Sequence, residues 1–199
     1  MNVYNQTIMK ELIERILKDG QGIGTEILKV DSFLNHQVDV DLTKKIGEEF
    51  AKLFNDCGAN KVLTVEASGI PAAAFTALAM GNLPMVFAKK SAPNTMKDGF
   101  YAAPVKSFTK GTLATIRVAK DYLNESDRVL IIDDFLATGE AAIGLVDLVK
   151  QSGGKVVGIG AVIEKEWQGG AKRLEALGYK VSSLAVVKSI NDGNIEFEE

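Results

Sequence analysis

The stretch from residue 129 to 142 holds the side chains of this chain that are best suited to chemistry. It reads VLIIDDFLATGEAA, so an apolar run leads into Asp133 and Asp134, and a turn of small residues follows at 137–141. Neighbouring carboxylates repel each other and lose hydration when they are partly buried. We therefore expect them to face a group rich in hydroxyls, or a cation such as Mg²⁺, which prefers oxygen ligands.

The turn after the two aspartates has the composition of an anion-binding loop. Small residues at the start of a helix leave backbone N–H groups free for an anion, and Thr138 adds a hydroxyl donor. A sugar phosphate fits both parts, with its phosphate on the turn and its ribose hydroxyls or a bound Mg²⁺ at the carboxylates. The same residues are also compatible with a buried strand and an acidic turn that only caps a helix. The turn is neither a Walker A loop nor a dinucleotide fingerprint.

Short apolar strands alternate with amphipathic helices around this motif. The spacing of apolar residues predicts helices over 6–18, 42–55, 140–151 and 168–177. It predicts strands over 26–30, 61–65, 84–90, 100–108, 112–119, 129–133, 156–165 and 180–187, with a glycine-rich break at 20–24. This alternation favours an α/β fold with a doubly wound, mostly parallel sheet. Ligands of such sheets bind at the C-terminal ends of the strands, where the aspartates are expected to lie.

Composition narrows the class of protein. The chain has 199 residues with 46% hydrophobic and 25% charged residues and a net charge of −3. These values suit one domain over residues 1–199, and they point to neither a nucleic-acid partner nor a membrane partner. No apolar run reaches the roughly 18 residues of a membrane span, and no signal peptide is expected. The single cysteine, Cys57, excludes an internal disulfide and favours a cytoplasmic location.

Residues 129–141 resemble the phosphoribosyl-diphosphate signature of type I phosphoribosyltransferases. Four apolar residues, two acids, two apolar residues and Ala-Thr-Gly-x-Ala stand in the order of that signature, although Phe135 is bulkier than the usual aliphatic residue. The resemblance implies the fold of that family, with residues 1–40 contributing a helix and a small purine-binding hood, and it implies a homodimer. The co-substrate would be 5-phospho-α-D-ribose 1-diphosphate (PRPP) with Mg²⁺. Its 5′-phosphate would bind Ala137, Thr138, Gly139, Glu140 and Ala141, and its ribose hydroxyls and, indirectly, the Mg²⁺ would meet Asp133 and Asp134.

Two further segments match the same family. Glu66-Ala67-Ser68-Gly69 is similar to the diphosphate-binding loop, in which Gly69 would let the backbone approach the ligand and Ser68 would donate to it. Lys89 and Lys90 end another strand, where relatives carry a basic residue that meets the diphosphate. The resemblance therefore places Glu66 with the aspartates in the catalytic group, and Ser68, Gly69 and Lys89 at PRPP. Taken alone, these segments could also be a plain turn and a solvated strand end.

The segment from residue 91 to 111 resembles the mobile hood loop that closes over the reacting centre. Closure would exclude water from a ribosyl cation that water would otherwise trap.

Two other stretches of the sequence indicate which purine base would be the substrate. LKVDSFLNHQVD at 28–39 resembles the N-terminal segment of the xanthine-using members of this family, and VIEKEWQ at 162–168 fits the same members. This likeness implies that Leu28, Asn35 and Lys165 contact the purine. A lysine can donate to the oxygens of xanthine, whereas the amino group of adenine would set a donor against a donor. Without the family, Lys165 could be a solvated strand-end lysine and Asn35 a turn residue.

The resemblance implies transfer of a phosphoribosyl group from PRPP to xanthine, giving xanthosine 5′-monophosphate and diphosphate in purine salvage. Transfer to guanine or adenine is the alternative within this class, because DDFLATG also resembles the adenine enzymes. A non-catalytic regulator that binds PRPP and DNA is the alternative from another class. The helix at 6–18 is followed by a glycine-rich turn rather than a second helix, and the acidic chain has no basic stripe, so the enzyme is favoured.

The turn carries no candidate general base at its first position. Hypoxanthine–guanine enzymes of this superfamily have an aspartate where this chain has Ala137. Catalysis is therefore expected to rest on orientation, on stabilisation of the diphosphate and on exclusion of water.

Overall fold

A six-stranded sheet runs through the middle of the computed structural model, which describes residues 8–91, 99–106 and 113–198. Across the sheet the strands lie in the order β10 (Asn194–Phe197), β9 (Val181–Asn191), β8 (Lys155–Lys165), β7 (Arg128–Leu136), β3 (Lys61–Val65) and β4 (Met85–Ala88). All neighbours are parallel except β10, which is antiparallel to β9. The predicted α/β fold with a mostly parallel, doubly wound sheet is confirmed.

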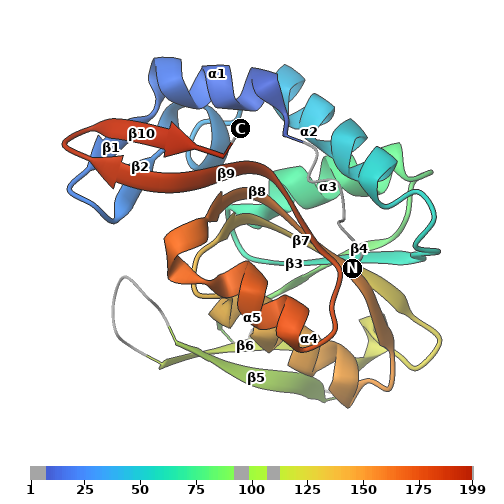
Figure 1. The fold of residues 1–199 in the computed structure, drawn as a ribbon. Coiled ribbons are helices and arrows are strands. Elements are labelled where there is room, and N and C mark those ends of the chain that lie inside the picture. The colour runs from blue at the N-terminus through green and yellow to red at the C-terminus, as the bar shows by residue number, and fades with distance from the viewer. Residues whose placement is uncertain (1–7, 92–98, 107–112, 199) are drawn as a thin grey trace.

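Helices cover both faces of this sheet (Figure 1). One face carries α1 (Lys10–Asp19), α2 (Val40–Leu53) and α3 (Gly69–Ala79), and the other carries α4 (Glu140–Gln151) and α5 (Gly170–Ala176). Strand β7 is apolar on both sides because its residues alternate between two cores. Leu130 and Ile132 join the core under α1–α3, whereas Val129 and Ile131 join the core under α4. This double burial explains the continuous apolar run that precedes the aspartates.

The chain reverses its direction of winding between β3 and β7. From β3 it passes through α3 to β4 at the edge, and it later returns to form β7 on the other side of β3. The two strands are parallel neighbours, with Leu63 paired to Ile131. Open α/β sheets bind ligands at such a switch point, so the segments that follow β3 and β7 are the place to look for a site.

The N-terminal hood is a hairpin of β1 (Gln21–Ile23) and β2 (Ile27–Lys29), followed by a π-helical turn at Asp31–Asn35. Only one strand, over 26–30, was predicted here, and the expected break at 20–24 in fact contains β1. The hairpin lies beside the turn between β9 and β10 (Figure 1). At Gly22 the contact is so close that an added Cβ would lie 2.7 Å from Cγ2 of Ile190. The C-terminal hairpin therefore supports the N-terminal one.

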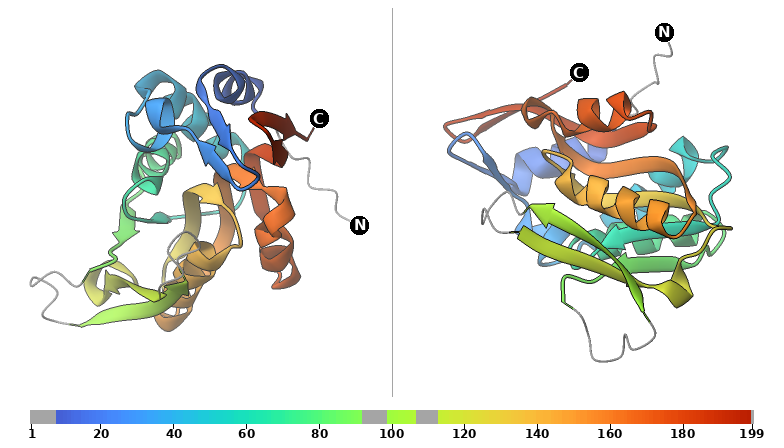
Figure 2. Two further views of the ribbon diagram at one scale, coloured as in Figure 1. Left: turned by 90° about the vertical axis from the view of Figure 1, so that its left-hand side faces the viewer. Right: turned by 90° about the horizontal axis from the view of Figure 1, so that it is seen from below.

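A second hairpin, β5 (Phe100–Lys106) with β6 (Leu113–Ala119), stands apart from the central sheet. Both strands were predicted, over 100–108 and 112–119, but they do not join the central parallel sheet. They pair with each other and lie on the α4 side, as Figure 2 shows from below. Two backbone hydrogen bonds between Lys89 and Arg117, of 2.8 and 2.9 Å, join β6 to the end of β4. Of the predicted hood loop, residues 92–98 and 107–111 lie outside the described residues, and 100–106 form β5.

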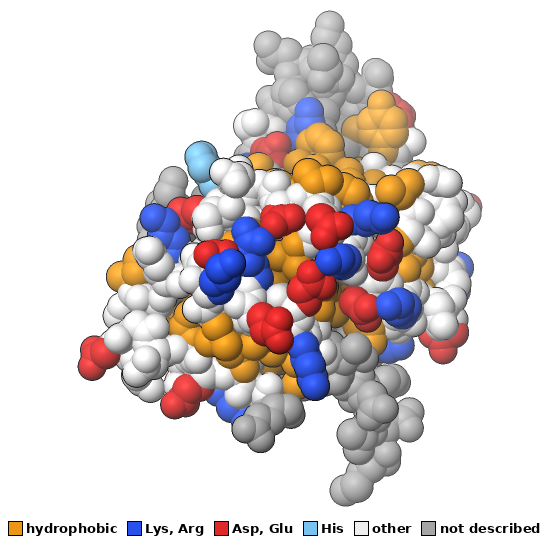
Figure 3. All heavy atoms as spheres, turned by 90° about the horizontal axis from the view of Figure 1, so that it is seen from above, with side chains coloured by type: hydrophobic (Ala, Val, Ile, Leu, Met, Phe, Trp, Pro, Cys, Tyr) orange, Lys and Arg blue, Asp and Glu red, His pale blue; other side chains and the backbone are white. Residues whose placement is uncertain are grey.

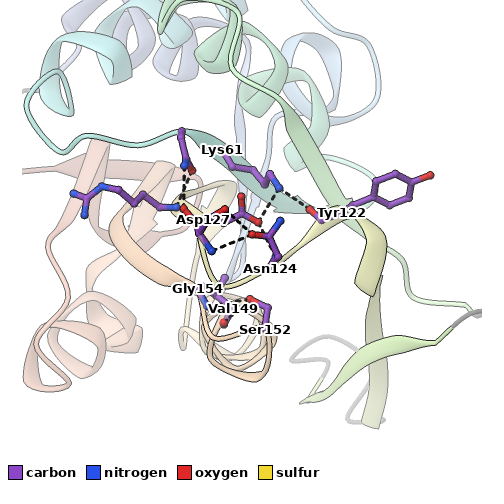
Figure 4. Close-up of polar contacts among 10 residues, drawn as sticks. Lys61, Tyr122, Asn124, Asp127, Val149, Ser152 and Gly154 are labelled. Carbon is purple, nitrogen blue, oxygen red and sulfur yellow. Dashed lines mark hydrogen bonds and ion pairs between the residues drawn. The ribbon is translucent and has the colours of Figure 1, made fainter.

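A polar clamp joins β3 and β7 at their N-terminal ends (Figure 4). Lys61 Nζ lies 2.8 Å from Asp127 Oδ2, and their side chains are only 12% and 7% exposed. The ammonium also donates to the carbonyl of Tyr122, and the carboxylate accepts from the backbone N–H of Asn124, each at 2.8 Å. The clamp therefore holds the two strands of the switch point together at the end away from the aspartates.

The outer face of α1 and α2 carries charges of both signs (Figure 3). Arg15 pairs with Asp19 and Asp39, and Lys45 pairs with Glu11 and Asp41. The Leu42 N–H and the Arg15 guanidinium hold the pKa of Asp39 below its usual value. This face is thus a paired surface rather than a field of one sign.

None of the helices that the structure describes is long and apolar enough to cross a membrane.

Candidate active site

A pocket of about 510 Å³ lies where the predicted motif leaves the sheet. The whole turn 137–141 lines it, together with Asp133 and Phe135 of β7. Two lysines, Lys90 after β4 and Lys106 at the end of β5, add positive charge. The pocket thus combines a carboxylate, cations and the start of α4.

The two aspartates lie inside β7 rather than at its end. The strand was predicted to stop at Asp133, but it continues to Leu136 because its backbone stays paired with β8, with Phe135 opposite Ile163. Asp133 and Asp134 are only 8% and 7% exposed. Burial and the neighbouring charge of Asp134 raise the pKa of Asp133 well above its usual range, while Lys90 acts in the opposite direction. The pair is therefore stabilised by any ligand that brings hydroxyl donors or positive charge.

The segment after β3 meets these carboxylates. Residues 66–69 lead from β3 into α3, and the peptide bond between Glu66 and Ala67 is cis. At Gly69 an added Cβ would lie 2.9 Å from Oδ1 of Asp133 and even closer, at 2.2 Å, to the Thr64 hydroxyl. Only glycine therefore allows the start of α3 to approach Asp133 so closely. Ser68 precedes this glycine as the N-cap residue of α3, and its side chain makes no capping hydrogen bond to the helix.

Glu66 contacts the backbone of Lys90, and of the neighbouring lysines Lys89 and Lys90 only Lys90 lines the pocket. The Glu66 carboxylate accepts a hydrogen bond of 2.6 Å from the backbone N–H of Lys90, which fixes the end of β4. Lys90 lines the pocket, whereas Lys89 is not among the lining residues, and its Nζ lies 5.8 Å from the centre of the Phe87 ring. Of the two lysines, Lys90 is the one placed to meet a ligand in this pocket.

The turn after β7 presents the start of α4 to the pocket. Gly139 is the N-cap residue with φ 81°, a left-handed conformation that favours glycine. No side chain caps this helix start, so the N–H groups of its first turn are left for another acceptor. Behind the turn, the N–H of Gly170 donates to the Ala137 carbonyl at 3.0 Å. The turn thus has the uncapped helix start that an anion site needs, and its binding of a phosphate stays a prediction.

The predicted purine residues gather at the hood. Lys165 Nζ donates to the Glu26 carbonyl at 2.6 Å and lies 5.6 Å from the centre of the Phe135 ring. Burial lowers the pKa of Lys165, and Glu26 opposes that shift. Leu28 is buried in the core against which Phe135 packs. Since Phe135 also lines the pocket, it connects the pocket with Lys165.

Asn35 is the least connected of the three. Its Oδ1 is buried and has no hydrogen-bond partner within the described part of the chain. None of Leu28, Asn35 and Lys165 is among the residues that line the pocket of 510 Å³. An amide oxygen that is buried and unpaired is ready to accept from a ligand N–H.

The model of the phosphoribosyl transferase domain family matches residues 39–198. The chain belongs to this family. It is 52% identical over 189 residues to the xanthine phosphoribosyltransferase of Streptococcus gordonii, and the matched region covers 95% of this chain and 97% of that protein. It is 51% identical over 191 residues to the xanthine phosphoribosyltransferase of Ruminiclostridium cellulolyticum, with 96% and 100% covered.

Solved structures of phosphoribosyltransferases share the fold. The adenine phosphoribosyltransferase of Thermoanaerobacter pseudethanolicus superposes with a TM-score of 0.64 at 27% identity, over 74% of this chain and 81% of that one. The adenine phosphoribosyltransferase of Rhodothermus marinus gives a TM-score of 0.71 at 23% identity, over 89% and 99%. The predicted type I phosphoribosyltransferase fold is therefore confirmed.

The carboxylates near the pocket bear on how a metal ion could be held there. No group of three or more His, Cys, Asp or Glu residues that could bind one occurs among residues 8–91, 99–106 and 113–198. Asp133 and Asp134 supply two carboxylates, while Glu66 is held by the Lys90 N–H. Mg²⁺ often keeps several waters and takes substrate phosphates as ligands, so a site completed by PRPP fits these residues.

Sequence reasoning missed three residues of the pocket. Lys90 was set aside for Lys89, because periodicity does not show which of two lysines points inward after a strand ends. Phe135 was noted for its bulk beside the acids but was expected to pack in the core, and it does both. Lys106 lies within the predicted hood loop 91–111 but was not singled out, because a single lysine in a loop segment does not show which way it points.

Proposed function

We propose that this enzyme transfers the phosphoribosyl group of PRPP to xanthine, giving xanthosine 5′-monophosphate and diphosphate in purine salvage. One observation carries the proposal: the pocket lined by the turn 137–141 and the buried Asp133 is also lined by Phe135, and the Lys165 ammonium, which does not line the pocket, lies 5.6 Å from the centre of that ring. The identity of about half of all residues to relatives named xanthine phosphoribosyltransferase supports the choice of base.

The turn would hold the 5′-phosphate of PRPP. The N–H groups at the start of α4 and the Thr138 hydroxyl would donate to the phosphate oxygens. Asp133 and Asp134 would accept from the ribose hydroxyls, which would offset the burial and, second, the repulsion by Asp134 that raise the pKa of Asp133. These contacts orient the sugar at a fixed distance from the purine site and remove much of the entropic cost of the reaction.

In the reaction, the bond between ribose C1 and the diphosphate oxygen breaks and its electron pair leaves with the diphosphate. A purine nitrogen forms the new bond to C1, and its proton is released to solvent. Lys90 and Lys106 line the pocket, where they would stabilise the negative charge of the leaving group. We propose that Glu66 serves catalysis by fixing the backbone of Lys90. We propose also that Ser68 and Gly69 bind the diphosphate of PRPP. Lys89 would add positive charge near that diphosphate. When bound with PRPP, Mg²⁺ would neutralise part of the diphosphate charge.

The purine would lie between the pocket and the hood. Phe135 offers a ring face on which a purine can stack. Lys165 Nζ would donate to a xanthine oxygen, while the Glu26 carbonyl keeps the ammonium in place. The unpaired Oδ1 of Asn35 would accept from a purine N–H, and Leu28 would form the apolar wall.

We propose further that the chain acts as one domain, in which residues 1–40 form the helix and hood, and that it works in the cytoplasm as a homodimer. Exposed apolar side chains on the β5–β6 hairpin, Phe100 at 40% and Leu113 at 75%, offer surface for a second copy. Light scattering would test the dimer. The proposal requires twice the chain mass of 21.4 kDa, and a monomer at enzyme-assay concentration would contradict it.

The class of function is tested by diphosphate release. PRPP, Mg²⁺ and xanthine should give diphosphate and xanthosine 5′-monophosphate in equal amounts. A non-catalytic regulator would bind PRPP and release no diphosphate with any purine, and that outcome would contradict the proposal.

A further inference from the structure

The phosphate-binding turn contains a residue of the wrong charge for its ligand. Glu140 is the first residue of α4, and it lines the pocket with Thr138 and Gly139. A carboxylate beside a bound phosphate dianion opposes binding, and the opposition is strong where water is partly excluded. A turn that serves as a phosphate site therefore needs a means of neutralising this side chain.

Arg173 of α5 reaches the turn from behind. Its Nη1 lies 2.5 Å from Oε1 of Glu140 and donates to the Thr138 carbonyl at 3.3 Å. One guanidinium nitrogen thus contacts both the acidic side chain and the backbone of the turn. The guanidinium is always charged in proteins, so it neutralises Glu140 at every physiological pH.

The start of α5 is built for this approach. Gly170 donates its N–H to the Ala137 carbonyl, and an added Cβ there would lie 2.3 Å from that oxygen and 2.8 Å from the Gly139 nitrogen. Arg173 follows three residues later, with its own N–H bound to the Gly169 carbonyl. The backbone of α5 therefore sets the distance from which Arg173 reaches the turn.

We propose that Arg173 is a positioning residue for the 5′-phosphate of PRPP. It neutralises the Glu140 carboxylate and holds it against α5, so that the N–H groups of the turn face the phosphate without a competing negative charge. Both side chains are substantially exposed, at 49% for Arg173 and 33% for Glu140, so the pair adds little to the stability of the fold. Its effect falls on PRPP affinity. This inference rests on the proposed function.

A double-mutant cycle tests it. Arg173→Ala should raise KM for PRPP about tenfold and change kcat less than about twofold, because one uncompensated charge then faces the phosphate. Glu140→Gln alone should lower KM for PRPP. The combined variant should recover most of the loss. Lys172→Ala is the matched control, since this neighbouring cation pairs with Glu166 at 3.5 Å and should leave KM unchanged.

Calorimetric titration with Mg²⁺ and PRPP, without any purine, gives a second readout that does not need turnover. It should show the same loss and recovery. Unchanged PRPP affinity in Arg173→Ala would overturn the inference, and so would an equal loss in the Glu140→Gln background. If the wild-type protein binds PRPP but turns over no purine, the proposed function fails while the titration still decides the role of Arg173.

Discussion

We propose that Lys165 donates to a carbonyl oxygen of xanthine, and its surroundings are compatible with this role. It is half-buried, it is held by the Glu26 carbonyl and it lies over the Phe135 ring. Lys165→Ala should lower kcat/KM for xanthine about ten- to a hundredfold, the effect of losing a hydrogen bond from a charged donor, and should change the value for adenine less. Steady-state kinetics with both bases measures the ratio. Lys188→Ala, which removes an exposed lysine of β9, is the control, and an unchanged xanthine-to-adenine ratio in Lys165→Ala would exclude Lys165 as the purine reader.

The Asp133 carboxylate should lower the stability of the folded protein while it supports activity. Its folded-state pKa is raised above the usual 3.8, first by burial and then by Asp134, so the folded protein binds a proton more readily than the unfolded chain. Stability therefore falls as pH rises from about 3.8 through the raised pKa. Asp133→Asn should raise the melting temperature at neutral pH, raise it less near about pH 4, and lower kcat/KM about a hundredfold or more. A lower melting temperature at neutral pH would show that the carboxylate is not destabilising.

The start of α3 depends on a glycine. Gly69→Ala would place a methyl group against the Thr64 hydroxyl and the Asp133 carboxylate, so α3 must shift. We expect a loss of about 1–3 kcal/mol in the free energy of unfolding, and a loss of PRPP affinity, because overpacking moves backbone. Urea unfolding and PRPP titration would measure the two effects. Gly178→Ala is the control: its Cβ meets open space at φ 87°, so it should cost stability but leave PRPP affinity intact.

Elements with strong local signals were predicted closely. The helix over 140–151 and the strand over 61–65 match α4 and β3, because helical periodicity and a bounded apolar run specify them. Strand β7 was predicted too short, since the second aspartate, Asp134, interrupts the apolar run, and the strand continues through Phe135 and Leu136 by pairing with β8.

The two missed strands, β1 and β10, are short members of local hairpins. Strand β1 pairs with β2 across a three-residue turn that begins with Gly24, and β10 pairs with β9 across Asp192 and Gly193. Both of these turn residues have positive φ, 45° and 86°, the requirement of a type I′ hairpin, so the Asp-Gly pair was a usable signal. The site shows a different limit: residues 129–141 indicated the small-residue turn, whereas Lys90, Lys106 and Arg173 come near it only through the tertiary fold.

The clamp between Lys61 and Asp127 lies at the N-terminal ends of β3 and β7, away from the pocket. We therefore expect it to contribute to the stability of the whole molecule and not to PRPP binding. Asp127→Ala leaves the Lys61 ammonium buried without its carboxylate and should cost about 3–5 kcal/mol in the free energy of unfolding. Glu49→Ala, which removes an exposed partner of Lys52, is the control and should cost less than about 1 kcal/mol. Urea unfolding measures both. Equal losses in the two variants would contradict the role of the clamp, and KM for PRPP should stay unchanged in each.

The central claim is that one pocket joins PRPP to xanthine in preference to other purines. The most direct measurement is product formation from PRPP and Mg²⁺ with xanthine, guanine, hypoxanthine and adenine in parallel. The account predicts the highest kcat/KM for xanthine and the lowest for adenine, whose amino group would face the donor of Lys165. A preference for adenine would contradict the assignment of the purine site to Lys165, Asn35 and Leu28.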